Sequence, residues 1–267
     1  MIALRRAACV LLAAASLLAS PVYSTSFSTD QSDLWYIPAE SGWGIQLVQR
    51  GSVIFATMFV YDPNGNPVWY VATMQFAGNF TWTGDLYATT GPWFGAVPFN
   101  PANVAARKVG TMTWAAQTVE TGTLSYVVDG VAVTKNVVRQ ALVLDDYSGT
   151  YLGALHATAT GCFNPANNFS GGEVFVTAYV AQSGQSISVS FVSSATGASV
   201  TVTGILTQYG QFGSILGTYS SSSGEVGNAL LFAMNTQLDS FSARFSFNST
   251  NIGCQNTGYL GGVRSRS

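Results

Sequence analysis

Charged residues and histidine are scarce in this chain. Asp, Glu, Lys and Arg together make up 8% of its 267 residues, against the roughly 25% that is usual in globular proteins. A single histidine, His156, stands in the whole sequence. Zinc sites and Ser-His-Asp or Cys-His mechanisms place histidine beside other reactive groups. The composition therefore argues against these chemistries, and we expect no metal site.

Long apolar runs are also missing, except at the N-terminus. Residues 5–6 are arginines, residues 7–18 form an apolar run, and small side chains precede a cleavage position after Ser24. This is the pattern of a secretory signal peptide, and the run is too short to span a membrane. We therefore expect residues 1–24 to be a cleaved signal peptide and the mature protein to be secreted or periplasmic, with no transmembrane segment.

Basic charge is low as well. The chain has 10 Lys and Arg and 12 Asp and Glu. Loss of Arg5 and Arg6 with the signal peptide leaves a net charge of about −4. Nucleic acids and anionic membrane surfaces are bound through basic patches, so neither is expected as a partner.

Only two cysteines remain after the signal peptide, because Cys9 is removed with it. Cys162 and Cys254 can then pair in one way only, in an oxidising compartment. A metal site is the weaker interpretation, because two thiolates need further ligands. We predict a disulfide between these two residues.

Strand patterns fill the mature chain, and helical periodicity is absent outside the signal peptide. All 6 tryptophans lie before Asp145, and both remaining cysteines lie after it. We predict an all-β fold of two tandem domains, an aromatic-rich domain over 25–146 and a Ser/Thr/Gly-rich domain over 147–267. Each is expected to be an antiparallel barrel or barrel-like sandwich of about eight strands.

The expected strands follow from β-branched and aromatic runs between turn residues. In the first domain they cover 33–37, 43–49, 52–61, 67–76, 80–88, 106–115, 121–128 and 131–142. In the second they cover 149–160, 172–182, 186–193, 199–209, 213–220, 226–235, 239–247 and 256–264.

Turn residues fix two hairpins and one long loop in the first domain. Asp62-Pro63-Asn64-Gly65-Asn66 and Asp129-Gly130 supply the conformations that tight turns need. Residues 89–105 carry three prolines and no alternation, and loops of that length are often functional.

The cysteine positions favour a barrel in the second domain. Cys162 follows the domain's first expected strand, and Cys254 precedes its last. In an up-and-down barrel these strands pair antiparallel, so the bridge would hold the closure and contribute about 4 kcal/mol. An open sandwich could also bring the two cysteines together.

The opening stretch DLWYIPAESGWG contains the residues that we consider for ligand binding. Glycines on both sides of Trp43 allow a tight bend that fixes the indole direction. Aromatic side chains could stack on a sugar or another flat ligand, while a carboxylate accepts hydrogen bonds; the residues concerned are Trp35, Tyr36, Glu40, Trp43, Trp69 and Tyr70. The alternative is a strand corner, with these aromatics in the core.

The strand Val53–Tyr61 is apolar on both faces. A soluble barrel normally exposes one polar face, so we expect the outer face of strand 52–61 to be covered by the second domain, another subunit or a partner.

Catalytic and nucleotide-binding patterns find little support. There is no G-x-S-x-G nucleophile turn and no glycine-rich loop between a strand and a helix, so no cofactor is expected. A two-carboxylate glycosidase would need Glu40 with Asp62 or Asp85, and no spacing in the sequence ties them together.

The segment from Ile37 to Gly44 resembles a motif of secreted proteobacterial proteins of unknown function, which reads NPAESGWG. Ile37 stands where those proteins usually have Asn. The pieces at 51–62, 67–71, 86–95 and 134–140 also resemble that family, and the second half is more weakly similar to a common companion domain. The resemblance implies export and an all-β fold, and it brings no established catalytic residues.

Together these observations favour an exported, non-catalytic binding protein or accessory module. The ligand would be a carbohydrate or a small envelope molecule, bound through aromatic side chains of the first domain. The alternative is a structural module that contacts a protein partner, or itself, through strand 52–61.

Overall fold

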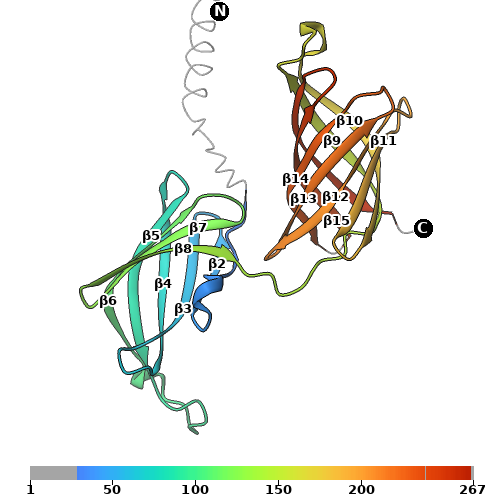
Figure 1. Cartoon of the computed structure of the whole chain (residues 1–267). Coiled ribbons are helices and arrows are strands. Elements are labelled where there is room, and N and C mark those ends of the chain that lie inside the picture. The colour runs from blue at the N-terminus through green and yellow to red at the C-terminus, as the bar shows by residue number, and fades with distance from the viewer. Residues whose placement is uncertain (1–28, 238, 266–267) are drawn as a thin grey trace, which may run out of the picture. The chain divides into compact units, whose positions relative to one another are not determined.

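The computed structural model describes residues 29–237 and 239–265, which form two closed antiparallel barrels of eight strands each (Figure 1). This confirms the all-β prediction and decides between its two alternatives, because each sheet closes on itself. The predicted signal peptide, residues 1–24, lies outside the described residues. Within the described part of the chain, no helix is long and apolar enough to cross a membrane.

The first barrel is an up-and-down meander in which each strand pairs with the next. Its strands are β1 (Asp33–Tyr36), β2 (Gly44–Arg50), β3 (Val53–Tyr61), β4 (Pro67–Gly78), β5 (Thr81–Thr90), β6 (Ala105–Ala116), β7 (Thr121–Val128) and β8 (Val131–Arg139). Closure comes from a short pairing of β1 with β8, at Trp35 opposite Arg139 and Tyr36 opposite Val138. Two 3-10 helices, η1 (Pro38–Glu40) and η2 (Pro101–Asn103), lie in the connections.

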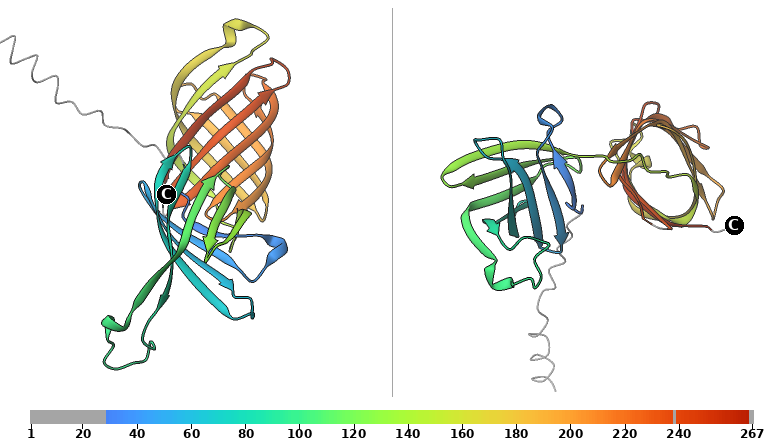
Figure 2. Two further views of the ribbon diagram at one scale, coloured as in Figure 1. Left: turned by 90° about the vertical axis from the view of Figure 1, so that its left-hand side faces the viewer. Right: turned by 90° about the horizontal axis from the view of Figure 1, so that it is seen from below.

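The second barrel repeats this topology and is seen nearly end-on in the right-hand view of Figure 2. Its strands are β9 (Gly149–Thr160), β10 (Phe169–Ser183), β11 (Ser186–Ser193), β12 (Ser199–Tyr209), β13 (Phe212–Ser221), β14 (Val226–Gln237), β15 (Ser240–Ser249) and β16 (Gln255–Arg264). The 3-10 helix η3 (Pro165–Asn167) connects β9 to β10. Strand β9 pairs with both β10 and β16 and so closes the barrel.

Side-chain alternation decides which residues fill each barrel. In β3, Ile54, Ala56 and Met58 are fully buried inside the first barrel. Their neighbours Phe55 and Phe59 face outward and are 45% and 49% exposed. The outer face of β3 is therefore an exposed apolar surface of this chain.

Aromatic side chains dominate both cores. In the first barrel, the rings of Trp35 and Trp114 lie with centroids 4.5 Å apart, and both are fully buried. In the second, Tyr151 packs on Phe241 with centroids 5.2 Å apart. Burying rings of this size supplies a large hydrophobic contribution to stability, which explains how a chain with few charges folds into two barrels.

The turns form as their residues predict. The Asp62 carboxylate accepts hydrogen bonds from the backbone N–H groups of Asn64 and Asn66, at 2.9 and 2.8 Å. At the second hairpin, Asp129 and Gly130 take φ values of 48° and 87°, as a two-residue hairpin turn requires. The predicted long loop is present between β5 and β6 and includes η2.

Because neighbouring strands run antiparallel, alternate connections meet at the same end of each barrel. In the first barrel, connections 37–43, 62–66, 91–104 and 129–130 share one end, which we name the loop end. In the second barrel, connections 161–168, 194–198, 222–225 and 250–254 share one end, which we name the disulfide end.

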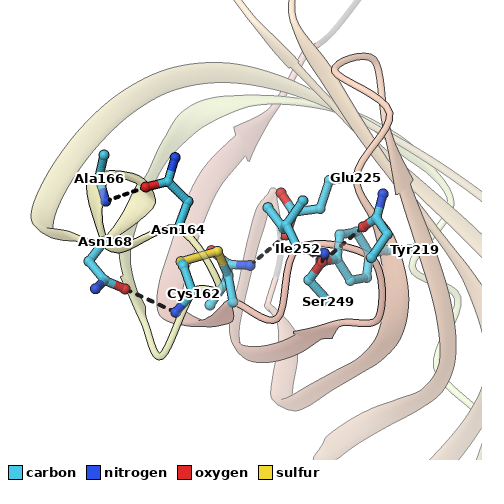
Figure 3. Close-up of a disulfide and its surroundings, with 11 residues drawn as sticks. Cys162, Asn164, Ala166, Asn168, Tyr219, Glu225, Ser249 and Ile252 are labelled. Carbon is cyan, nitrogen blue, oxygen red and sulfur yellow. Dashed lines mark hydrogen bonds between the residues drawn. A yellow bond between two sulfur atoms is a disulfide. The ribbon is translucent and has the colours of Figure 1, made fainter.

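The predicted disulfide between Cys162 and Cys254 is present at this disulfide end (Figure 3). Next to it, Thr160 of β9 pairs with Gln255 of β16. The end of the first strand thus meets the start of the last, and the bridge links the two strands that close the barrel. A disulfide persists in oxidising compartments, so it indicates an extracytoplasmic protein.

Two strand boundaries differ from the sequence prediction by three residues, and the others differ by at most two. Strand β8 ends at Arg139 instead of residue 142, where the chain leaves the barrel after one more bond, from Gln140 N–H to the Leu34 carbonyl. Strand β10 begins at Phe169 instead of residue 172. A bulge at Gly171, with φ of 68°, lets the strand continue through a segment that reads as a loop.

Candidate functional site

The loop end of the first barrel brings together side chains from the opening motif and from distant strands. Proline at the start of η1 suits its tight turn, and the Glu40 N–H donates to the Ile37 carbonyl at 2.9 Å. Gly42 follows with φ of 113°, which turns the chain back so that Trp43 reaches Glu40. The motif therefore forms a compact corner ahead of β2.

Glu40, Trp43 and Lys135 form a polar cluster on this corner. The Trp43 indole Nε1–H donates to Glu40 Oε2 at 3.1 Å, and the Lys135 Nζ donates to the same oxygen at 2.6 Å. Lys135 also lies 5.7 Å from the centre of the Trp43 ring, within the range of a cation–π contact. These contacts hold the indole, the carboxylate and the ammonium in one arrangement.

The charges of this cluster define its chemistry. The hydrogen bond from Lys135 lowers the pKa of the Glu40 carboxyl below its usual value, and the Trp43 indole adds to this effect. Burial raises the pKa of the nearby Tyr126 phenol, an effect that Lys135 opposes and Glu40 supports. At neutral pH the cluster thus presents an ion pair and a neutral phenol. Such groups suit hydrogen bonding to a polar ligand better than proton donation by Glu40.

An exposed aromatic groove adjoins the cluster through Gly42. It encloses about 450 Å³ and is lined by Gly42, Phe59, Val60, Tyr61, Pro67, Val68 and Trp69. Phe59 and Trp69 are cross-strand partners on the outer face of β3 and β4, and they are 49% and 50% exposed. Aromatic faces held side by side by strands offer a stacking surface that needs little ordering on binding.

The six ligand-binding residues proposed from sequence do not all meet. Glu40 and Trp43 join the cluster, and Trp69 lines the groove. Tyr36 and Tyr70 are partly buried in β1 and β4.

Trp35 has no exposed face. Its indole N–H donates to the Gln31 carbonyl at 3.1 Å, and its side chain is 0% exposed in the core. It belongs to the core alternative that the sequence left open, because its position on β1 points into the barrel.

Residues that sequence reasoning missed complete the site. The apolar pattern on both faces of strand 53–61 is a signal from which Phe59 and Tyr61 could be predicted. Lys135 carried no such signal, since it lies 95 residues from Glu40 in the chain and only the closure of the barrel brings them together.

The tryptophans should divide into two classes in acrylamide quenching of residues 25–267. Trp35, Trp82 and Trp114 are at most 1% exposed, whereas Trp69 and Trp93 are 50% and 68% exposed. We expect a quenchable, red-shifted component beside a protected, blue-shifted one, and we expect Trp69→Phe with Trp93→Phe to remove most of the quenchable part. Uniform quenching of all the emission would contradict the arrangement described here.

His156 lies on the outward face of β9 in the second barrel. Its ring stacks on that of Tyr259, with centroids 5.1 Å apart and planes at 13°. Both cysteines of this barrel are in the disulfide. Within the described residues, no three His, Cys, Asp or Glu side chains gather as a metal site would require.

Comparison with known proteins gives only a distant similarity. No family model and no curated protein matches the chain. A crystal structure of a "putative outer membrane protein" from Bacteroides fragilis aligns over 87% of this chain and 95% of its own, with 12% identity and a TM-score of 0.34. A similarity this low transfers no property of that protein. The resemblance to the proteins with the NPAESGWG motif stays a prediction.

Proposed function

We propose that this chain is an exported, non-catalytic binding protein that recognises carbohydrate at the loop end of its first barrel. The observation that carries the proposal is the exposed groove in which Phe59 and Trp69 lie side by side. Sugar rings present apolar C–H faces that pack on such aromatic side chains, with polar groups around them for the hydroxyls. Glu40 lies two residues before Gly42 of the groove wall and supplies an acceptor, and its ion-pair partner Lys135 supplies a donor.

Export supports the same proposal. The N-terminal 24 residues have the pattern of a signal peptide cleaved after Ser24, and the disulfide agrees with a secreted or periplasmic location. In those compartments, surface and wall polysaccharides are abundant potential ligands for a non-catalytic module.

Replacement of Trp69 by alanine tests the site. We expect Trp69→Ala to reduce retention on immobilised oligosaccharides of glucose or N-acetylglucosamine, or on peptidoglycan, at least about fivefold, since stacking of a flat ring on an aromatic side chain contributes about 1–3 kcal/mol. The measurement is affinity electrophoresis or isothermal titration with residues 25–267. Phe55→Ala, on the same outer face but outside the groove lining, is the matched control and should bind like the wild type.

The second candidate function is protein contact through the apolar outer face of strand 52–61. Val48 and Phe55 are cross-strand partners, 42% and 45% exposed, and they extend the apolar outer face of β3 beyond the groove. A module that contacts a protein partner or itself through strand 52–61 predicts concentration-dependent association in sedimentation that Phe55→Ser abolishes. Sugar binding unaffected by Trp69→Ala, or no sugar binding at all, would exclude the carbohydrate proposal.

A further inference from the structure

The second barrel contains a cavity that opens at its disulfide end. The cavity measures about 780 Å³, within the range of roughly 300–1,000 Å³ that is usual for small-molecule sites. Inward-facing residues Leu155, Ala157 and Val200 line it, and they are only partly buried although they pack on the main core. Deeper interior positions such as Val189 and Val202 are 0% exposed. The interior of the barrel is thus filled around Val189 and Val202 and contains the cavity nearer the disulfide end.

Only one half of the disulfide end is closed. On that half, Tyr219 donates its hydroxyl to Glu225 Oε1 at 2.6 Å, and Asn256 Nδ2 donates to the same oxygen at 2.9 Å. The Tyr219 ring stacks on Phe247, with centroids 4.9 Å apart. The disulfide lies beside this network (Figure 3), and its two cysteines pack against Ala159. The other half, between β9 and β12, has no comparable plug among the described residues and forms the cavity.

A break in strand pairing opens the cavity sideways. Strand β10 pairs with β9 as far as Phe169 but with β11 only as far as Val176. The last bond on the β11 side runs from Ser194 N–H to the Phe175 carbonyl. Residues 169–174 of β10 therefore have a strand neighbour on one side only, and the cavity lies along the other side. An elongated ligand could enter between β10 and the 194–198 connection.

Small residues form part of the cavity wall beside Ala157. Ala157 has glycine as its cross-strand neighbour on both sides, Gly172 on β10 and Gly258 on β16. A side chain at Gly172 would meet open space, because nothing lies within 4 Å of its Cβ position, whereas backbone and the Phe245 ring fill the space beside Gly258. The small side of the cavity wall is therefore formed by Ala157 and Gly172, where the core ends and the cavity begins.

The lining chemistry selects the ligand class. The deep part is apolar, and hydroxyl side chains surround the rim: Ser193, Ser194, Thr196, Ser199, Ser221, Ser222 and Ser223. Among the described residues, the charged side chains in the lining are Glu173 and Glu225, both acidic, and no Lys, Arg or His is in the lining. An anionic head group would find no cation in this lining and would meet the Glu225 carboxylate at the rim, while Glu173, the cross-strand partner of His156, lies on the outward face of β10. Hydroxyl groups would instead hydrogen-bond an uncharged polar head.

We propose that the second barrel binds an uncharged amphiphile with a single apolar chain, such as a long-chain alcohol or a neutral glyceride. The chain occupies the hollow between Leu155, Ala157 and Val200, and the polar head lies at the serine-rich rim. This site is separate from the carbohydrate site proposed on the first barrel, and neither proposal depends on the other.

The test uses a neutral fluorescent probe, N-phenyl-1-naphthylamine, with residues 25–267. We expect saturable fluorescence enhancement and displacement by dodecanol at a concentration at least tenfold lower than that of laurate, which has the same chain length and an anionic head. No saturable enhancement, or displacement by laurate as effective as by dodecanol, would overturn the proposal.

Substitutions inside and outside the cavity show where the fluorescent probe binds. Ala157→Phe fills the cavity and should reduce probe binding at least tenfold, whereas Ala154→Phe, on the outward face of the same strand, should not. If Ala157→Phe fails to show wild-type thermal unfolding by circular dichroism, Val174→Phe at the cavity mouth replaces it. Trp69→Ala should leave probe binding intact, which separates this site from the first barrel. Equal effects of the inward and outward variants would exclude the cavity as the site.

Discussion

Replacing Arg139 by alanine is expected to lower the free energy of unfolding of the first barrel by about 3–5 kcal/mol, the cost of breaking a buried ion pair. The Arg139 side chain is 0% exposed and its Nη1 lies 3.0 Å from Asp33 Oδ2. It also donates to the carbonyls of Ser32 and Val119 and lies over the Trp35 ring at 4.3 Å. Arg139 thereby links β8 to β1 where the barrel closes, and its removal leaves Asp33 without this cation.

The measurement is urea unfolding followed by tryptophan emission, which reports on the first barrel because all 6 tryptophans belong to it. Arg107→Ala is the matched control. Arg107 also pairs with an aspartate, Asp129, at 2.6 Å, but the two side chains are 63% and 55% exposed, and exposed pairs often contribute nothing measurable. Arg139→Lys keeps the charge but lacks the planar guanidinium fork. Its loss of unfolding free energy should lie between the losses of Arg139→Ala and Arg107→Ala. Equal small effects at Arg139 and Arg107 would contradict the closure described here.

Replacing both Cys162 and Cys254 by alanine is expected to destabilise the second barrel by about 4–5 kcal/mol on the chain-entropy estimate for a loop of this length. The bridge spans 92 residues of sequence and joins the strands that close the barrel. Without it, the unfolded chain gains the freedom that the closed loop had restricted, and the β9–β16 pairing must hold by hydrogen bonds and packing alone.

Calorimetry of residues 25–267 distinguishes this effect from a general loss of stability. We expect the double variant to shift the unfolding of the second barrel to lower temperature while the tryptophan-detected transition of the first barrel stays in place. Reduction of the wild type with dithiothreitol should reproduce the shift. An unchanged calorimetric profile would show that the disulfide does not stabilise the barrel.

Much of the fold follows from local patterns. Strands in both domains were located to within a few residues, because apolar alternation and turn residues such as Asp62 and Gly65 mark their limits directly. The cysteine positions added topology, since a bridge between the first and last strands of a domain fits a closed barrel. The choice between barrel and sandwich still needed the structure, because both can bring Cys162 and Cys254 together.

The site was less accessible to sequence reasoning. Strand alternation shows that successive residues face opposite sides, but it does not say which side is inside. Trp35 and Trp69 both read as strand aromatics, yet Trp35 fills the core and Trp69 lines the groove. The partner of Glu40 was also hidden, because Lys135 lies on the last strand of the barrel and meets the opening motif only after closure.

The most direct test of the binding proposal is a fluorescence titration of residues 25–267 with soluble oligosaccharides of glucose, of N-acetylglucosamine and of peptidoglycan. The proposed site predicts that at least one of these ligands saturably shifts the quenchable emission component and protects it from acrylamide, while the buried component of Trp35, Trp82 and Trp114 stays unchanged. Trp69→Phe should abolish the response. An emission spectrum and quenching profile that no oligosaccharide alters would contradict carbohydrate recognition at the loop end.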